Sequence, residues 1–544
     1  MQKIDLIRIY QRKTALVIDD FTDMRGTIRR MLSNFGLAAI DVAGTGEEAI
    51  ARCEQRHYDI ILSDYNLGEG KNGQQILEEL RHRELLRHGA IYVMVTAETT
   101  RAMVFGALEY QPDDYLTKPF TQPVLQQRLD RLVIEKETLR EVNEALDRKD
   151  YRAAIGHCDD HIVARDRYAQ RCLHLKAICY EKLRDFAAAE TIYQAAQAER
   201  PLEWARIGLG KCLLARGALN EAEQIFQTLI DERSLCLEVY DNLAEIKCRR
   251  GDVATAQQLL EHASDISPNA ILRQQMLAEI SEANGDWERA EKAHRRVLRL
   301  EANSCYESPE NFLKMARCIS TAMRATGDRL RLKEVKEVLE RGQRRYRDNP
   351  EVTLQSAIIL AAARADAGNE TQARSSLETI ASKIAAAAES PSPAVILELA
   401  RAWQTVGEAA VAQQLLADLA ARFPEDQALL EVIDRTADEP LSNEGKERAV
   451  ALNGEGRKLL ADSQFAKAVQ LFGEALRIFP NNNALKLNLL LALIQEMTTN
   501  GVRPELLQRA DATAAAVKGL GADHPLHDRL ALLRAHLDRL RAAA

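Results

Sequence analysis

The sequence predicts two folds in one chain of 544 residues: a doubly wound α/β domain, followed by an all-helical array of repeats. Short apolar runs alternate with amphipathic stretches over roughly the first 130 residues, whereas small residues recur at a regular spacing from residue 154 onward. Aromatic residues make up only 5% of the chain, and Ala, Leu, Glu and Arg are abundant. This composition is typical of a mostly helical protein.

The α/β domain is expected over residues 14–132, after an N-terminal extension of residues 1–13. Five apolar runs have the length and composition of buried strands, at residues 15–18, 39–42, 60–63, 91–95 and 114–117. Helical patterns follow them, starting near Thr22, Gly46, Gly73, Arg101 and Gln122. Five successive βα units predict a parallel sheet with helices on both faces.

Polar side chains come directly after four of these runs. Asp19 and Asp20 follow the first strand, Asp64 the third, Thr96 the fourth and Lys118 the fifth. Because a doubly wound sheet binds ligands at the carboxyl ends of its strands, we expect these side chains to share a pocket. Three clustered carboxylates favour a hard divalent cation such as Mg²⁺. The residues therefore predict phosphoryl transfer to a carboxylate, with Mg²⁺ and Lys118 neutralising the phosphoryl charge.

The segments LVIDDFTDMR, IILSDYNL, VTAE and DDYLTKPF resemble the receiver domain of two-component response regulators, a flavodoxin-like fold. The resemblance implies that Asp64 is the phospho-acceptor. It also implies a metal site formed by Asp19, Asp20, Asp64 and the backbone carbonyl of Asn66.

The same resemblance assigns the remaining pocket residues. Lys118 would contact the phosphoryl oxygens, Thr96 would donate a hydrogen bond to them, and Tyr115 would turn inward as Thr96 moves. Asn66 and Glu98 occupy positions that tune hydrolysis of the phosphoaspartate, and both match the chemotaxis-type receivers, which predicts a short-lived phosphoryl group. The loop LGEGKNG departs from the family pattern and leaves partner docking there open.

Residues 123–147 contain no Gly or Pro after Pro123, which predicts one helix that extends the first domain into the array. Its apolar residues lie near one face: Leu125, Leu129, Leu132, Leu139, Val142 and Leu146. We interpret this helix as a packed connector. The alternative is a coiled coil that joins two chains in a homodimer.

Small residues recur every 33 to 35 positions, at Ala154, Ala189, Ala222, Ala256 and Ala290. Twelve residues before the last four come Ala177, Gly210, Ala244 and Ala278. The spacing resembles the tetratricopeptide repeat (TPR), an α-helical hairpin that stacks into a superhelix. We expect repeats over residues 148–302 and 396–500, degenerate repeats over 303–395 and capping helices over 501–544. The insertion around residues 386–393 is expected to separate two stacks.

Two smaller clusters have both a structural and a functional interpretation. His157 and His161 lie one helical turn apart beside Cys158, with Cys172 and His174 nearby, which suits either a metal site or the polar face of a repeat helix. A basic cluster precedes Pro350, and it suits either RNA binding or a helix C-terminus, where cations are stabilised. Its members are Arg341, Arg344, Arg345 and Arg347.

The bulk properties favour protein partners. Net charge is −8, no tract resembles a basic tail, and no run approaches 18 uninterrupted apolar residues, so we expect neither DNA binding nor membrane insertion. The nine cysteines include no CxxC pair, and the start resembles no secretory signal, so a cytoplasmic protein with reduced thiols is expected.

These observations predict a response regulator whose output is protein binding and not metabolic catalysis. A histidine kinase or phosphotransfer protein would phosphorylate Asp64, and the repeat groove would hold another protein. One alternative is a phosphate sink for a shared kinase, with the array serving as a docking scaffold. A transcriptional or RNA regulator is the weakest alternative, because no separate helix-turn-helix is evident.

Overall fold

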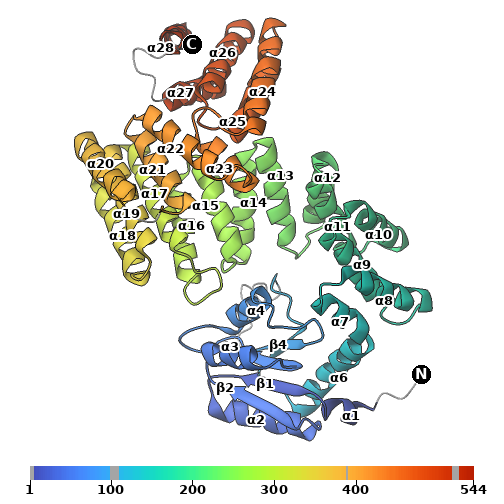
Figure 1. The fold of residues 1–544 in the computed structure, drawn as a ribbon. Helices are drawn as coiled ribbons and strands as arrows, with labels where there is room; N and C mark the ends of the chain where they lie inside the picture. The colour runs from blue at the N-terminus through green and yellow to red at the C-terminus, as the bar shows by residue number, and fades with distance from the viewer. Residues whose placement is uncertain (1–4, 98–108, 387–389, 518–525, 544) are drawn as a thin grey trace. The chain divides into compact units, whose positions relative to one another are not determined.

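The computed structural model describes residues 5–97, 109–386, 390–517 and 526–543 (Figure 1). The chain forms two compact units, Met1–Ser308 and Pro309–Ala544. The first unit contains a sheet domain and a series of helices, and the second is helical. In the described ranges no helix has both the length and the apolar character needed to cross a bilayer.

The sheet domain contains five parallel strands in the order β2-β1-β3-β4-β5 (Figure 1). They are β1 Thr14–Ile18, β2 Ala39–Ala43, β3 Ile60–Asp64, β4 Ile91–Thr96 and β5 Asp114–Thr117. Of the three inner strands, β3 and β4 are buried along their whole length, as expected for strands covered on both faces. All five predicted strands are thus present, within one residue at each end.

Helices cover both faces of this sheet. On one face lie α2 (Thr22–Asn34) and α6 (Gln122–Thr138), and on the other α3 (Gly46–Gln55) and α4 (Gly73–His82). The helix expected near Arg101 lies outside the described residues. The predicted doubly wound fold is therefore confirmed for the part of the domain that the structure describes.

The N-terminal extension belongs to the core of this domain. It forms α1 (Leu6–Tyr10), and Tyr10 is only 1% exposed. The Tyr10 hydroxyl donates a hydrogen bond of 2.8 Å to Asp130 on α6, and its ring lies 6.2 Å from that of Phe35. An aromatic side chain thus joins the extension to both helices of this face.

The connector is not one continuous helix. It breaks at Leu139 between α6 and α7 (Arg140–Asp147), so the prediction of a single helix is wrong. The apolar stripe changes its packing partner at this residue. The positions before it pack on the sheet, whereas Leu139, Val142 and Leu146 pack against the next helical hairpin. Because the whole stripe is buried within the chain, the packed-connector interpretation holds and this face offers no seam for a coiled coil.

The rest of the first unit consists of helices joined by short turns. These are α8 Tyr151–Ala164, α9 Ala169–Lys182, α10 Phe186–Glu199, α11 Glu203–Ala215, α12 Leu219–Asp231, α13 Glu238–Arg250, α14 Val253–Ile266, α15 Ile271–Ala283 and α16 Trp287–Leu300. Aspartates cap four of them at the N-terminus by accepting a backbone N–H, at Asp150, Asp185, Asp252 and Asp286.

The periodic small residues lie where paired helices approach closely. The five alanines of the main series are fully buried. A Cβ atom at Gly210 would lie 2.6 Å from the ring of Phe226 on the next helix, so only glycine fits there. The spacing therefore predicted the contact positions of the helical hairpins correctly.

The second unit contains the remaining helices. They are α17 Pro309–Thr326, α18 Leu332–Arg345, α19 Pro350–Asp366, α20 Glu370–Ala386, α21 Pro393–Thr405, α22 Ala409–Arg422, α23 Gln427–Thr436, α24 Asn443–Ala461, α25 Phe465–Ile478, α26 Asn483–Asn500, α27 Pro504–Ala516 and α28 His527–Ala543, with a 3₁₀ turn at Arg329–Arg331. One apolar core contains side chains from α19 to α23, including helices on both sides of residues 387–389. The expected break between two stacks at residues 386–393 is therefore wrong, because the helices on either side share this core.

Candidate functional site

Three carboxylates meet at the carboxyl edge of the sheet. Asp19 follows β1, and its backbone N–H donates to Ala43 on β2, so the turn is tied to the sheet. Asp64 is the last residue of β3. Asp19 and Asp64 are 1% and 7% exposed, whereas Asp20 faces solvent. One oxygen from each of the three carboxylates lies within 4.8 Å of the other two, a spacing that suits one divalent cation.

Lys118 joins this cluster from β5. Its Nζ donates to Asp19 Oδ2 at 2.7 Å and to Asp64 Oδ2 at 2.8 Å. The Lys118 backbone N–H donates to the Thr96 carbonyl at 2.7 Å, and the following Lys118–Pro119 peptide is cis. Segments nearly a hundred residues apart in sequence thus place one ammonium between two buried carboxylates.

The charges in the cluster do not balance. Burial raises the pKa of Asp64, and the hydrogen bond from Lys118 opposes this shift. Burial lowers the pKa of Lys118, but its hydrogen bonds to Asp19 and Asp64 outweigh burial and leave the pKa above its usual value. Lys118 is therefore charged at neutral pH, and one ammonium faces three carboxylates. Additional positive charge would stabilise this site.

Two further predicted residues lie on the neighbouring strands β4 and β5. Thr96 ends β4 and is 2% exposed, and it is in register with Thr117 on β5. Tyr115 is half-buried on β5 and packs against the core on the α3 and α4 side of the sheet. Glu98, the second residue expected to tune hydrolysis, lies outside the described residues.

The loop after Asp64 is held close to the strand by Gly73. A Cβ atom on Gly73 would collide with the Asp64 carbonyl oxygen, so α4 can start here only with glycine. The Gly73 N–H donates to the Tyr65 carbonyl at 2.9 Å, and Tyr92 donates its hydroxyl to the Gly73 carbonyl at 2.8 Å. Within this loop the Asn66 side chain accepts the N–H of Gly68 at 3.2 Å. Gly73 of the LGEGKNG loop thus has a packing function.

Arg25 is a pocket residue that the sequence analysis missed. From α2 it donates to the backbone carbonyls of both Asp19 and Asp20, the latter at 3.0 Å. Phe21 donates its N–H to Asp19 Oδ1 at 2.9 Å in the same turn. Arg25 therefore fixes the acidic turn through its backbone; it ends the segment LVIDDFTDMR, but the sequence analysis assigned it no role.

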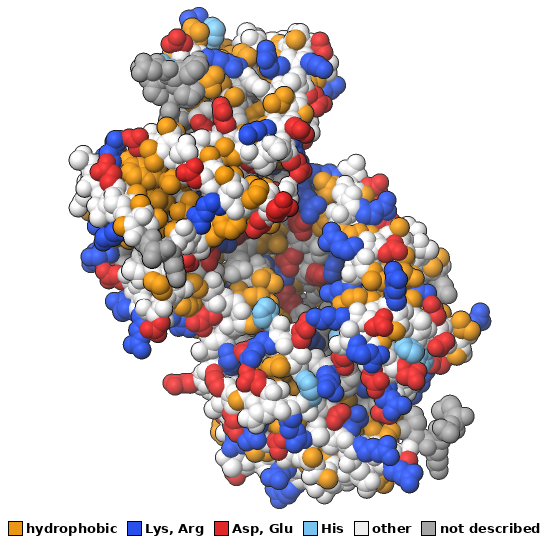
Figure 2. Space-filling view, viewed as in Figure 1, with side chains coloured by type: hydrophobic (Ala, Val, Ile, Leu, Met, Phe, Trp, Pro, Cys, Tyr) orange, Lys and Arg blue, Asp and Glu red, His pale blue; other side chains and the backbone are white. Residues whose placement is uncertain are grey.

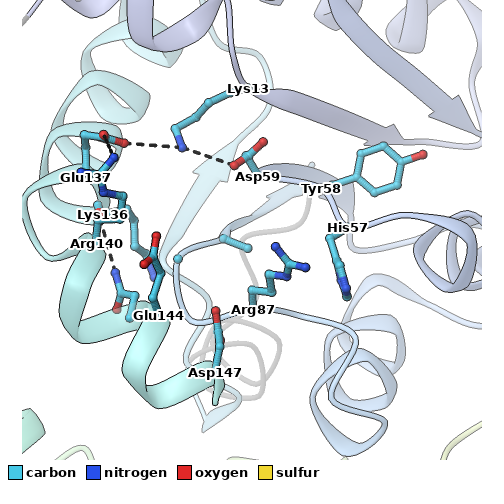
Figure 3. Close-up of a pocket in the computed structure, with 13 residues that line it drawn as sticks. Lys13, His57, Tyr58, Asp59, Arg87, Lys136, Glu137, Arg140, Glu144 and Asp147 are labelled. Carbon is cyan, nitrogen blue, oxygen red and sulfur yellow. Dashed lines mark hydrogen bonds and ion pairs between the residues drawn. The ribbon is translucent and has the colours of Figure 1, made fainter. Parts of the chain in front are cut away.

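A second charged hollow lies at the opposite, amino edge of the sheet (Figure 3). Here Lys13 lies between Asp59, at 3.3 Å, and Glu137 on α6, at 4.0 Å (Figure 3). Lys136 pairs with Asp113 at 2.9 Å. Basic and acidic side chains are present in similar number around this hollow, so it anchors α6 to the sheet without an excess of either charge.

The two smaller clusters have structural roles. No group of metal-ligand atoms found in the described ranges includes a residue of the stretch 157–174. His161 Nδ1 instead contacts Asp166 at 2.5 Å, and Cys158 and Cys172 lie in an apolar core. The basic cluster before Pro350 lies in and after the last turn of α18, where cations stabilise the exposed carbonyls.

Comparisons with known proteins agree with this geometry. The family described as "Response regulator receiver domain" matches residues 15–130, and "Tetratricopeptide repeat" matches residues 275–304. Chemotaxis protein CheY-3 of Vibrio cholerae is 30% identical over 117 residues, which cover 22% of this chain and 88% of that protein. Chemotaxis protein CheY of Pseudomonas aeruginosa is 31% identical over 117 residues, which cover 22% of this chain and 93% of that protein.

Solved structures of receiver proteins cover a similar share of the chain. A Vibrio cholerae CheY4 structure is 24% identical and covers 22% of this chain and 98% of its own, with a TM-score of 0.21. A CheY-like receiver protein from Methanospirillum hungatei is 25% identical and covers 23% and 96%, with a TM-score of 0.21. The matched region includes every strand of the sheet and the acidic cluster. The chain belongs to the response regulator family, with an N-terminal CheY-like receiver domain followed by a helical region that contains tetratricopeptide repeat sequence.

Proposed function

We propose that Asp64 accepts a phosphoryl group from a histidine kinase or phosphotransfer protein, and that this modification controls protein binding by the repeats. A carboxylate oxygen of Asp64 attacks the phosphorus, the P–O bond forms as the P–N bond of phosphohistidine breaks, and the histidine nitrogen recovers its proton. The observation that carries the proposal is the single ammonium of Lys118 shared by two buried carboxylates at the carboxyl edge.

Asp19, Asp20 and Asp64, together with the backbone carbonyl of Asn66, would hold a Mg²⁺ ion. The three carboxylates are close enough to share one ion, and hard oxygen ligands suit it. When bound, Mg²⁺ supplies positive charge that offsets the charge on the transferring phosphoryl oxygens. Lys118 is within reach of the same oxygens and remains charged at neutral pH.

Thr96 and Tyr115 would carry the signal away from the pocket. Thr96 ends the strand beside Asp64 and would donate its hydroxyl to a new phosphoryl oxygen. Tyr115 lies half-buried on the next strand and would turn inward as Thr96 moves. Asn66 and Glu98 would set how quickly water removes the phosphoryl group.

The recipient of this signal is a protein. Stacked helical hairpins form extended surfaces that hold peptides or helices. Figure 2 shows acidic and basic side chains intermingled over the visible face of the sheet domain, with no broad basic surface of the kind that nucleic acid needs. All nine cysteines are free thiols, which suits work in the reducing cytoplasm.

The test is phosphorylation of the full chain by acetyl phosphate, a small phosphodonor. Acid-labile phosphate should accumulate with Mg²⁺ present and disappear when EDTA removes the metal. Phosphate incorporation that is unchanged by EDTA would contradict the proposed metal site. Absence of incorporation with both acetyl phosphate and a histidine kinase would contradict the proposed function. Fast turnover by a chain that binds no protein except its kinase would favour the phosphate-sink alternative.

A further inference from the structure

Within the first unit, the receiver domain contacts the last two helices of its own repeats. Glu109, just before β5, lies against Arg273 on α15 and Ser267 before it. Gln75 on α4 lies against the end of α16. Both contacts join segments at least 150 residues apart in sequence, so they connect the receiver domain directly to α15 and α16.

Arg273 is the centre of the first contact. Its side chain is only 2% exposed, and it donates to Asp241 Oδ1 at 2.7 Å and Oδ2 at 2.8 Å. Its Nη2 also donates to Glu109, whose second oxygen accepts the Ser267 hydroxyl at 2.6 Å. The remaining nitrogen, Nη1, is buried without a hydrogen-bond partner. One guanidinium thus holds a carboxylate from the repeats with two nitrogens and a carboxylate from the receiver with only one.

The second contact covers the C-terminus of α16. The last carbonyls of a helix have no partner within that helix. Gln75 Nε2 donates to the Leu300 carbonyl at 3.3 Å and to the Ala302 carbonyl at 3.2 Å, and Lys71 Nζ donates to the Asn303 carbonyl. The receiver therefore satisfies acceptors that the repeat leaves open. The residues that do so belong to the LGEGKNG loop and the first turn of α4.

Both contacts start from segments that are attached to the phosphoryl pocket. The Lys71 loop leaves β3 directly after Asp64. Glu109 lies on the connection between β4, which ends at Thr96, and β5, which carries Tyr115. Lys71 thus lies seven residues from Asp64, and Glu109 lies six residues from Tyr115, so each contact is close in sequence to a residue of the phosphoryl pocket.

We propose that residues 267–306 form a docking surface for an acidic protein segment, which Glu109 occupies in the unphosphorylated chain and leaves when Asp64 is phosphorylated. We call the Glu109–Arg273 and Gln75–Leu300 contacts the clasp. The unpartnered Nη1 of Arg273 argues for an acidic occupant, because a carboxylate that engages Nη1 together with Nη2 makes two charge-assisted hydrogen bonds where Glu109 makes one. An incoming Asp or Glu side chain can therefore displace Glu109. The opening step rests on the proposed function of Asp64.

Hydrogen exchange of the full chain tests the clasp. In Glu109→Gln, which keeps the size of the side chain, amides of α15 and residues 300–306 should exchange about tenfold faster, since a hydrogen bond between charged groups is lost. Glu232→Gln is the matched control, because it breaks the Arg206 ion pair inside the repeats without touching the receiver. Unchanged exchange in Glu109→Gln overturns the clasp.

The same experiment with beryllofluoride and Mg²⁺, which mimic the phosphoryl group, tests the opening step. Residues 60–73 should gain protection while α15 and residues 300–306 lose it. Protection at 60–73 with no change in the repeats overturns the opening step alone. No protection at 60–73 counts against the proposed function as well, and the Glu109→Gln comparison then still decides whether the clasp holds the repeats.

A peptide probe tests the acidic occupant. Labelled tetraglutamate should bind Glu109→Gln about tenfold more tightly than the wild-type chain, because Arg273 then lacks its charged competitor. Tetraglutamine is the matched control and should bind neither chain measurably. Equal affinity of the two peptides, or of the two chains for tetraglutamate, overturns the assignment of an acidic partner.

Discussion

The two ends of strand β3 carry similar residues in opposite electrostatic situations. Asp59, just before its amino end, contacts Lys13 at 3.3 Å and accepts the N–H and hydroxyl of Thr14 at 2.9 and 3.1 Å. Asp64, at its carboxyl end, shares the one ammonium of Lys118 with Asp19. Both edges therefore combine a lysine with a strand-end carboxylate, but only the carboxyl edge has an excess of negative charge.

The balance of charge distinguishes a cluster with a structural role from a candidate reactive site. At the amino edge Asp59 accepts from Lys13 and Thr14, and Asp113 pairs with Lys136, so these carboxylates have donors without a ligand. At the carboxyl edge three carboxylates face one ammonium, so a cation and a phosphoryl group can add what is missing. Substitutions at the two edges should therefore have unlike effects.

The largest contrast is expected between Asp64→Asn and Asp59→Asn. Asp64→Asn removes the attacking oxygen and should abolish phosphorylation by acetyl phosphate. Asp59→Asn should leave phosphorylation intact and cost about 1–2 kcal/mol of stability through lost hydrogen bonds. Phosphate incorporation and thermal unfolding of the two variants measure this. Equal incorporation would remove the functional distinction between the two edges.

The next largest contrast is expected in the phosphorylation rate, between substitutions of Lys118 and Lys136. Lys118→Gln removes the charge that faces the phosphoryl oxygens and should slow phosphorylation by roughly 10²–10³-fold, as loss of one transition-state donor does. Lys136→Gln is the matched change at the amino edge, where the ammonium pairs with Asp113. Its phosphorylation rate should stay within about twofold of wild type, because Lys136 pairs with Asp113 at the edge of the sheet opposite to Asp64. A similar slowing in both variants would contradict a direct role for Lys118.

The lifetime of the phosphoryl group should respond to Asn66. Asn66 lies two residues after Asp64 on the loop that borders the pocket, so a long basic side chain there would obstruct the attacking water. Asn66→Arg should lengthen the half-life of the phosphorylated chain several-fold, measured as decay of acid-labile phosphate after the donor is removed. Arg56→Gln, a change on the loop after α3, provides a control that should not alter the decay. Unchanged decay in Asn66→Arg would contradict the assigned role.

The last contrast is one of stability and concerns Glu78 on α4. Burial raises the pKa of Glu78 from 4.5 to about 7, and a hydrogen bond from Tyr110 opposes the shift. Because the folded chain binds this proton more tightly than the unfolded chain, stability should fall as pH rises from about 4.5 to 7. Glu78→Gln should remove this dependence and stabilise the chain by roughly 2–3 kcal/mol at pH 8, with little effect at pH 4.5.

Urea unfolding of wild type and Glu78→Gln at several pH values measures this difference. Glu79→Gln on the same helix is the comparison. Glu79 pairs with Lys71 at 2.9 Å, so this substitution should destabilise the folded chain. A stabilising effect of Glu78→Gln that is the same at every pH would show that proton binding is not its origin.

The receiver pocket was predictable because its residues are tied to local patterns. Each of Asp19, Asp64 and Lys118 ends an apolar run, and the rule that parallel strands share a carboxyl edge brings them together. The small residues of the hairpins were predictable for a similar reason, since each repeat presents the same close contact. Local pattern and fixed topology suffice for both.

Other features depend on contacts that no local pattern encodes. The helix breaks at Leu139 because its apolar residues before and after this position pack into two different cores. The helical period is the same on either side, so the sequence pattern does not reveal the break. Glu109 and Arg273 are 164 residues apart, and their meeting depends on how several hairpins stack. The apolar core across residues 387–389 was missed because an insertion in the sequence resembles a boundary even when the flanking helices pack together.

The most direct test of the account is to identify the phosphorylated residue. Borohydride reduces an aspartyl phosphate to homoserine, so peptide mass spectrometry of the treated full chain locates the modified carboxylate. We predict one modified residue, Asp64, and none at Asp59, with the modification absent when Mg²⁺ is removed. Modification of a different residue, or of none under conditions in which acetyl phosphate remains intact, would contradict the account.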